Sequence, residues 1–192
     1  MDPIAPVATP HTERGSLALL WAVLAGAAVA LALGVYGREH DAAGQALFTL
    51  GFSGTINMKA WLATVAFILA IVQVVLALWM YGKLGGRSAP DWVGPTHRLT
   101  GTLALLFTLP VAYHCLWSLG FETESGSTRR YLHSIFGCVF YGAFTTKVLC
   151  VRSSRLPSWA LPVVGGLLFV CFVVLWLTSS LWFFDNVGFP SF

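Results

Sequence analysis

Two histidines flank a short polar segment between two apolar runs of the chain. His114 lies in AYHCLWSLGF, residues 112–121, and His133 lies in RRYLHSIFG, residues 129–137. A haem b held by two imidazoles needs one ligand on each face, from two helices and at comparable depth. Antiparallel helices joined by this short segment would place both rings in the same half of a membrane. The pattern therefore predicts His114 and His133 as the metal ligands of one haem b.

The neighbouring residues suit a haem. Gly137 lies one turn beyond His133 and leaves room for the edge of a porphyrin. Arg129 and Arg130 stand at the polar end of the same segment, where haem propionates need cationic partners. The alternative for a single histidine near a helix end is a hydrogen bond to water, a backbone carbonyl or a lipid headgroup. Two histidines at matching depth favour the ligand pair.

The composition indicates that these histidines lie in a membrane protein. Of 192 residues, 57% are hydrophobic and only 10% are charged, which leaves too little charge to solvate a globular surface. Runs of about 20 apolar residues are long enough to cross the hydrocarbon core of a bilayer. Such runs occupy residues 17–36, 60–81, 99–120, 131–150 and 159–184. The chain is therefore expected to contact a lipid bilayer, and the small net charge of +3 does not indicate nucleic acid.

The five apolar runs predict an all-α integral membrane protein, because backbone groups in lipid must be hydrogen-bonded within the chain. We expect a four-helix bundle of the haem-binding type plus one extra N-terminal helix. The first run is longer than the apolar part of a signal peptide, so we expect it to be retained. Two glycines in the last run, Gly165 and Gly166, would permit a close approach between helices. Pro110, one turn before His114, predicts a kink that turns this ring inward.

The basic residues predict the orientation. Lys and Arg accumulate on the cytoplasmic side of membrane proteins. Seven of the eleven fall on one side, namely Arg14, Lys83, Arg87, Arg98, Lys147, Arg152 and Arg155. We therefore expect residues 1–16 in the cytoplasm and the tail 185–192 outside, in a bacterial cytoplasmic (inner) membrane.

His97 leaves several interpretations open. It lies 17 residues before His114, or about 25 Å along a helix, on a face about 100° away. A second haem there would need a partner such as Met80 or Lys147, and we favour one haem over two. His97 could instead contact a quinone such as menaquinone or admit a proton. The first choice is an interfacial histidine in the N-cap region beside Thr96.

The four cysteines are expected to be small buried side chains. Cys115, Cys138, Cys150 and Cys171 all lie in apolar runs, and no two form a C-x-x-C pair.

Three segments carry a resemblance to known proteins: KAWLATVAFILAIVQVVLALWMYGKL (59–84), HRLTGTLALLFTLPVAYHCLWSLGF (97–121) and LHSIFGCVFYGAFTTKVLCVRSSRLPSWALPVVGG (132–166). They resemble a family of actinobacterial polytopic membrane proteins. More loosely, a four-helix unit with histidines at the ends of its spans resembles membrane b-type cytochromes and ferric-reductase-like transmembrane domains. The looser resemblance implies a haem-bearing bundle with His114 and His133, and in part His97, as ligands. Two-haem members usually offer four histidines on two helices, whereas this chain has three.

The function expected from these residues is that of a b-type cytochrome subunit. It would relay electrons between the quinone pool and a membrane or extracytoplasmic redox partner, as the electron-transfer subunit of an oxidoreductase rather than a stand-alone enzyme. The chain contains no flavin or nicotinamide domain, so a reductase activity would require that partner. One alternative is a haem-free structural or assembly subunit of a larger membrane complex. A weaker alternative is a small transporter or proton channel.

Overall fold

A computed structural model describes residues 10–85, 88–122, 126–153 and 156–189. The segment 1–16 and the tail 185–192, for which a side of the membrane was predicted, therefore lie partly outside the described residues. Arg87 and Arg155 from the predicted cytoplasmic set also lie outside them.

The described residues are helical and contain no strand. The helices are α1 (Pro10–Glu39), α2 (Thr55–Met80), α3 (Val93–Tyr113), α4 (Thr128–Arg152), α5 (Ala160–Trp176) and α6 (Trp182–Asn186). Two π-helical segments, η1 (His114–Leu119) and η2 (Leu177–Leu181), continue α3 and α5. Five helical stretches within the described part of the chain are long and apolar enough to cross a membrane. These stretches confirm the prediction of an all-helical protein with five spans.

The first four helices begin earlier than the apolar runs that predicted them. The third run starts at residue 99, but α3 starts at Val93; the fourth starts at residue 131, but α4 starts at Thr128. Hydropathy detects only the apolar part of a helix, whereas backbone hydrogen bonds continue into the polar turns beside it. His133 is therefore five residues inside α4, or about 7.5 Å from its start.

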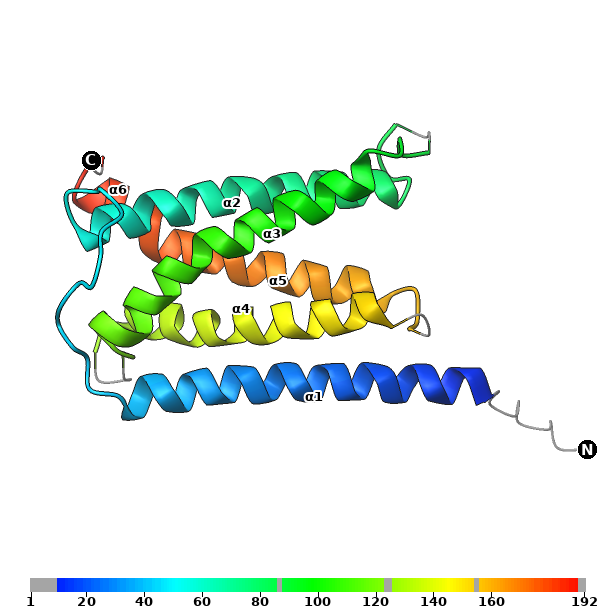
Figure 1. Cartoon of the computed structure of the whole chain (residues 1–192), viewed down its shortest axis with the longest axis horizontal. Helices are drawn as coiled ribbons and strands as arrows, with labels where there is room; N and C mark the ends of the chain where they lie inside the picture. Colours follow the sequence, from blue (N-terminus) through cyan, green and yellow to red (C-terminus); the bar gives the residue numbers. More distant parts are fainter. Residues whose placement is uncertain (1–9, 86–87, 123–125, 154–155, 190–192) are drawn as a thin grey trace, which may run out of the picture.

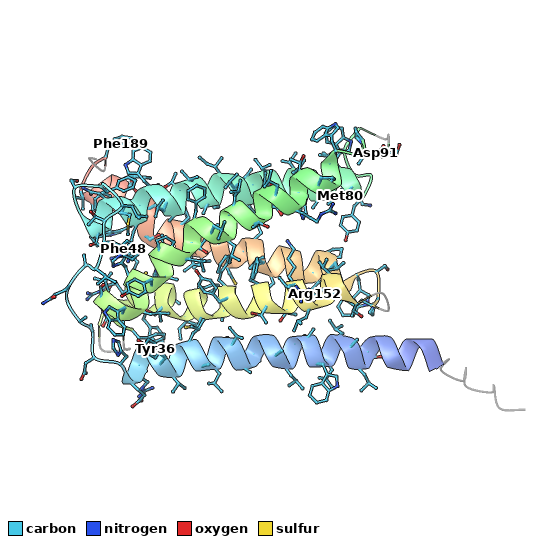
Figure 2. All side chains as sticks on the ribbon, in the orientation of Figure 1. Tyr36, Phe48, Met80, Asp91, Arg152 and Phe189 are labelled. Atoms are coloured by element: carbon cyan, nitrogen blue, oxygen red, sulfur yellow. The ribbon has the colours of Figure 1, made fainter. Side chains whose placement is uncertain are left out.

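Helices that are consecutive in the chain are not always packed together. Helix α2 packs against α3, and α4 packs against both α1 and α5 (Figure 1). The consecutive helices α3 and α4 have few close backbone contacts. Tyr36, Phe48 and Phe189 mark one end of the bundle, and Met80, Asp91 and Arg152 mark the opposite end (Figure 2). At the first end, a connection of residues 40–54 runs from α1 to α2 (Figure 1).

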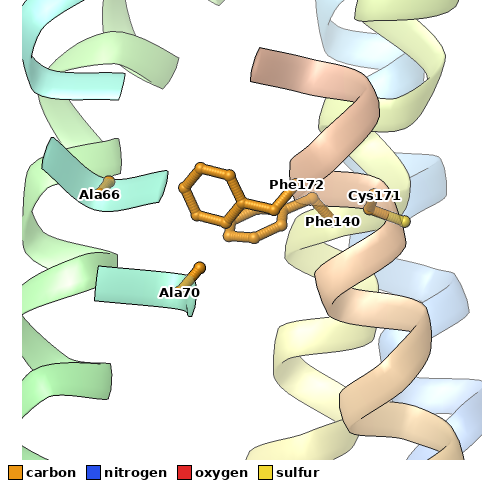
Figure 3. Packing of buried hydrophobic residues seen from close by; sticks show 5 residues of the cluster. All are labelled: Ala66, Ala70, Phe140, Cys171 and Phe172. Carbon is orange, nitrogen blue, oxygen red and sulfur yellow. The ribbon is translucent and has the colours of Figure 1, made fainter. Parts of the chain in front are cut away.

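Aromatic rings fill the core between α2, α4 and α5. Phe140 of α4 and Phe172 of α5 meet edge to face, with ring centroids 5.1 Å apart. Ala66 and Ala70 of α2 face these rings (Figure 3). The small alanine side chains leave the space that the two phenylalanines occupy, so this layer holds α2 to the other two helices.

Helix α1 approaches α4 most closely at two glycines. A Cβ atom added at Gly142 would lie 2.6 Å from the carbonyl oxygen of Gly26 and 2.9 Å from Cβ of Ala30. The Thr146 hydroxyl also donates a hydrogen bond to the Ala22 carbonyl at 3.2 Å, which links the two helices. Small residues allow such backbone proximity in membrane helices.

The close approach that Gly165 and Gly166 would permit does not occur at these glycines. Nothing lies within 4 Å of a Cβ atom added at either position. The sequence shows where glycines stand but not which of them faces another helix.

Gly142→Leu is expected to loosen α1 from α4. The added side chain would collide with the backbone of Gly26, and overpacking of this kind costs roughly 1–3 kcal/mol in the free energy of unfolding. The measurement is the thermal unfolding midpoint in detergent. Gly166→Leu is the matched control because its surroundings are open, and an equal loss of stability in both variants would contradict the prediction.

Candidate functional site

A cavity of about 500 Å³ lies between α2, α3, α4 and α5, at the end of the bundle that contains η1 and η2. Its volume is within the range of about 300–1,000 Å³ found for small-molecule and cofactor sites. A hydrogen bond at the cavity wall joins α3 and α4. The Tyr141 hydroxyl of α4 donates it to the Thr108 carbonyl of α3 at 3.1 Å, and both residues line the cavity. Most of the wall is apolar, including Phe140, Phe172 and Trp176. Such a cavity can hold a bulky hydrophobic ligand within the membrane-spanning region.

Polar side chains line one part of this wall. The charged side chains and the histidine among them are Lys59, Glu122, Arg129, Arg130 and His133. Three of the five carry a positive charge and one carries a negative charge, so this region attracts anionic groups. A hydrophobic ligand with acidic substituents would match both the apolar and the cationic parts of the wall.

His133 is held in one tautomer by its neighbour on η2. Its Nδ1 atom lies 3.0 Å from Oγ1 of Thr178, and the Thr178 hydroxyl donates its own proton to the Val174 carbonyl at 2.7 Å. Because this hydroxyl proton is directed to the carbonyl, the hydrogen-bond network assigns the proton of the imidazole to Nδ1 and its lone pair to Nε2. Metal-ligating histidines are typically oriented in this way, by donating the other ring N–H to a fixed acceptor.

Arg129 lies close to the same residues. Its guanidinium donates a hydrogen bond to the Thr178 carbonyl and stands over the Trp182 ring, 3.9 Å from the centroid. Arg130 forms an ion pair with Glu122 at 2.8 Å, and its side chain is 61% exposed. Both predicted arginines line the cavity, but each already has a partner from the chain.

His114 does not line the cavity. Its Nδ1 atom lies 3.1 Å from Oγ of Ser118, which donates its own proton to the Gln45 carbonyl at 2.8 Å. The imidazole meets the Phe48 ring edge to face, with centroids 4.7 Å apart. The side chain is fully buried, and its Nε2 atom has no hydrogen-bond partner. The ring is thus covered by the connection 40–54.

The predicted arrangement, with both imidazoles facing one gap, is therefore not the arrangement in the structure. The residues of α3 and η1 that line the cavity are Thr108, Val111, Ala112, Cys115, Leu116 and Leu119. His114 precedes Cys115 by one residue, which places it about 100° further around the helix. Pro110 was expected to turn this ring inward, and the ring is fully buried, but it lies against the connection 40–54 and not at the cavity. Matching depth along two helices does not determine which face of α3 meets the cavity.

The sequence interpretation missed Cys115. Its thiol interacts with the His133 ring and with the Lys59 ammonium, and all three side chains line the cavity. Cys115 is half-buried, whereas Cys138, Cys150 and Cys171 are buried, as the sequence predicted. A signal was present in the sequence, because Thr108, Val111 and Cys115 recur at helical spacing on one face.

Gly137 lines the cavity one turn beyond His133. The nearest side-chain atom to an added Cβ, on Leu175, would be 4.0 Å away, so the space beside this glycine is not filled by another helix.

His97 lies near the opposite end of α3 and does not line the cavity. The N-cap of α3 is Trp92, so His97 is inside the helix and the expected N-cap-region position is wrong. Its carbonyl accepts a hydrogen bond from the Gln73 amide at 2.6 Å, while its ring Nδ1 is buried without a partner. The charges that act on the ring are those of Lys147 and Arg98.

Comparison with known proteins gives a family without an assigned activity. The model of a family of unknown function, DUF6529, matches residues 18–191. The chain belongs to this family. No curated protein and no solved structure matches the chain. The expected resemblance to membrane b-type cytochromes stays a prediction, and this DUF6529 chain has the composition and helices of a multi-pass membrane protein.

Proposed function

We propose that this DUF6529 protein is a membrane-embedded electron carrier that holds one haem b in the cavity, with His133 as a ligand of the iron. The observation that carries the proposal is the state of His133. Its Nδ1 atom is hydrogen-bonded to Thr178, which assigns the lone pair to Nε2 in a half-buried ring on the cavity wall. This is the form in which an imidazole binds iron.

The remaining wall agrees with a haem. The apolar and aromatic side chains suit the macrocycle, and the cationic part with Lys59, Arg129 and Arg130 suits two propionates. Gly137 keeps the wall open one turn beyond the ligand. Within the described residues, no group of three or more His, Cys, Asp or Glu side chains could hold a metal ion alone. Haem iron needs only one or two ligands from the chain, so it fits this sparse set.

The chain's own residues would do three things in this role. His133 fixes the position of the iron, Thr178 orients the imidazole, and the apolar wall excludes water. Bound haem supplies one-electron chemistry between the ferrous and ferric states. The cavity lies at the end of the bundle that contains η1 and η2, which agrees with exchange of electrons at one membrane face.

The proposed setting follows the sequence expectation. The membrane is a bacterial cytoplasmic membrane, with the N-terminus inside and the C-terminus outside. The quinone pool would be on one side of the electron relay and an extracytoplasmic or membrane redox protein on the other. We propose menaquinone as the quinone.

The test is a reduced-minus-oxidised absorption spectrum of the detergent-purified full chain, with a pyridine haemochrome assay for stoichiometry. We expect a b-type spectrum and about one haem per chain, because the cavity wall carries one imidazole and one imidazole binds one haem iron. A colourless protein that also fails to bind added hemin would overturn the proposal. That result would favour the haem-free structural subunit instead.

A further inference from the structure

The side chain that α3 and η1 present to His133 is Cys115. Its thiol interacts with the imidazole of His133, which belongs to α4, and with the ammonium of Lys59, which belongs to α2. Three helices thus bring one sulfur, one imidazole and one cation together on the wall of the same cavity. No other cysteine shares this arrangement. Cys138 lines the cavity but is on the same helix as His133, and Cys150 and Cys171 do not line it.

Sulfur and imidazole are both ligands of haem iron in proteins. Ligands on opposite faces must come from opposite walls, and α3 and α4 have few close backbone contacts with each other. We infer that Cys115 is the second protein ligand of the haem, opposite His133, so that the site is a cysteine–histidine pair rather than a pair of histidines. This inference rests on the proposed function. The sulfur binds iron as a thiolate and releases its proton.

Lys59 provides an electrostatic reason for a sulfur ligand at this position. A sulfur ligand brings a negative charge into an apolar region, where an unpaired charge is costly. The Lys59 ammonium lies beside the sulfur and offsets this charge. Lys59 is half-buried on α2, and the other charged groups of the cavity wall are Arg129, Arg130 and Glu122.

His114 is a poorer candidate for the same position. To reach the cavity, its ring would have to leave Ser118 and the Phe48 ring, both of which hold it against the connection 40–54. That connection is itself fixed to η1, because the backbone N–H groups of Ala43 and Gly44 donate to the carbonyls of Trp117 and Ser118 at 3.0 and 3.1 Å. Cys115, by contrast, already lines the cavity.

The experiment compares absorption and electron paramagnetic resonance spectra of the ferric, haem-loaded full chain with those of three variants. We expect the wild type to show thiolate-ligated low-spin iron. Cys115→Ser should keep haem but lose the thiolate signature. Cys138→Ser is the matched control, because it removes another sulfur from the same cavity, and its spectrum should not change. Cys115→His should give a bis-histidine spectrum, a positive result that only a folded protein can produce.

Two outcomes would overturn the inference, and they differ from each other. A haem-bearing wild type with a bis-histidine spectrum that Cys115→Ser leaves unchanged would overturn the sulfur ligand alone. In that case His114→Ala would remove the bis-histidine signal. A wild type that binds no haem would overturn the proposed function, and the sulfur ligand with it.

Discussion

His133→Ala is expected to purify without haem. In the wild type, the Nε2 lone pair of His133 is available on the cavity wall because Nδ1–H is fixed on Thr178. Alanine removes this ligand and enlarges the cavity, so the pyridine haemochrome assay should fall from about one haem per chain to less than about a tenth of that value. Without the imidazole, only the sulfur of Cys115, packing and the cationic wall remain to retain the cofactor.

His114→Ala and His97→Ala are the controls for this result. Neither ring lines the cavity, so both variants should retain haem at the wild-type stoichiometry. The sequence interpretation predicts the opposite for His114, since it assigned both histidines to one haem. Full haem retention in His133→Ala, together with loss in His114→Ala, would show that the ligand comes from beneath the connection 40–54.

The sequence was sufficient to predict the helices but not their faces. Five apolar runs predict five membrane-spanning helices because hydropathy and length are local properties of the chain. Which side of α3 meets the cavity depends on packing against α2 and on the connection 40–54, which are not local. This is why His114 was predicted on the cavity wall and Cys115, the next residue, was overlooked. The glycines show the same dependence on packing. Gly142 contacts α1, whereas Gly166 has open space around it.

The two histidines nevertheless share a feature that no sequence pattern revealed. In each, Nδ1 is hydrogen-bonded to a hydroxyl that donates its own proton to a backbone carbonyl. Both hydroxyls lie in π-helical segments, Ser118 in η1 and Thr178 in η2. Segments of this kind occur frequently at functional sites, and they leave backbone carbonyls free for other donors. In this protein the Ser118 carbonyl accepts from Gly44, and the Thr178 carbonyl accepts from Arg129.

The same hydrogen-bond chain ends differently at the two histidines. The Nε2 atom of His114 is buried without a partner, an arrangement that costs about 1–3 kcal/mol for a desolvated polar group. The Nε2 atom of His133 belongs to a ring on the cavity wall, beside Cys115. Two rings are therefore oriented alike, and only one of them has access to a ligand. The hydroxyl that orients His133 becomes the next group to test.

Thr178→Val is expected to weaken haem binding by about 10- to 100-fold, the usual effect of removing a group that orients a metal ligand. Valine has nearly the shape of threonine but cannot accept the Nδ1–H of His133. The ring would then rotate more freely or adopt the other tautomer, in which Nε2 carries the proton and cannot bind iron. The Thr178 carbonyl is unchanged, so Arg129 keeps its partner on η2. The measurement is a titration of haem-depleted protein with hemin.

Two further variants decide whether the missing hydroxyl is the cause. Thr178→Ser restores a hydroxyl at the same position and should recover most of the affinity. Thr145→Val is the matched control, because the Thr145 hydroxyl donates to the carbonyl of Tyr141 in its own helix at 2.9 Å and does not contact His133. Equal losses in Thr178→Val and Thr145→Val would mean that general loosening of the bundle, rather than the orientation of His133, limits binding. A loss confined to Thr178→Val and reversed by serine would identify the imidazole as the group through which the cavity holds its cofactor.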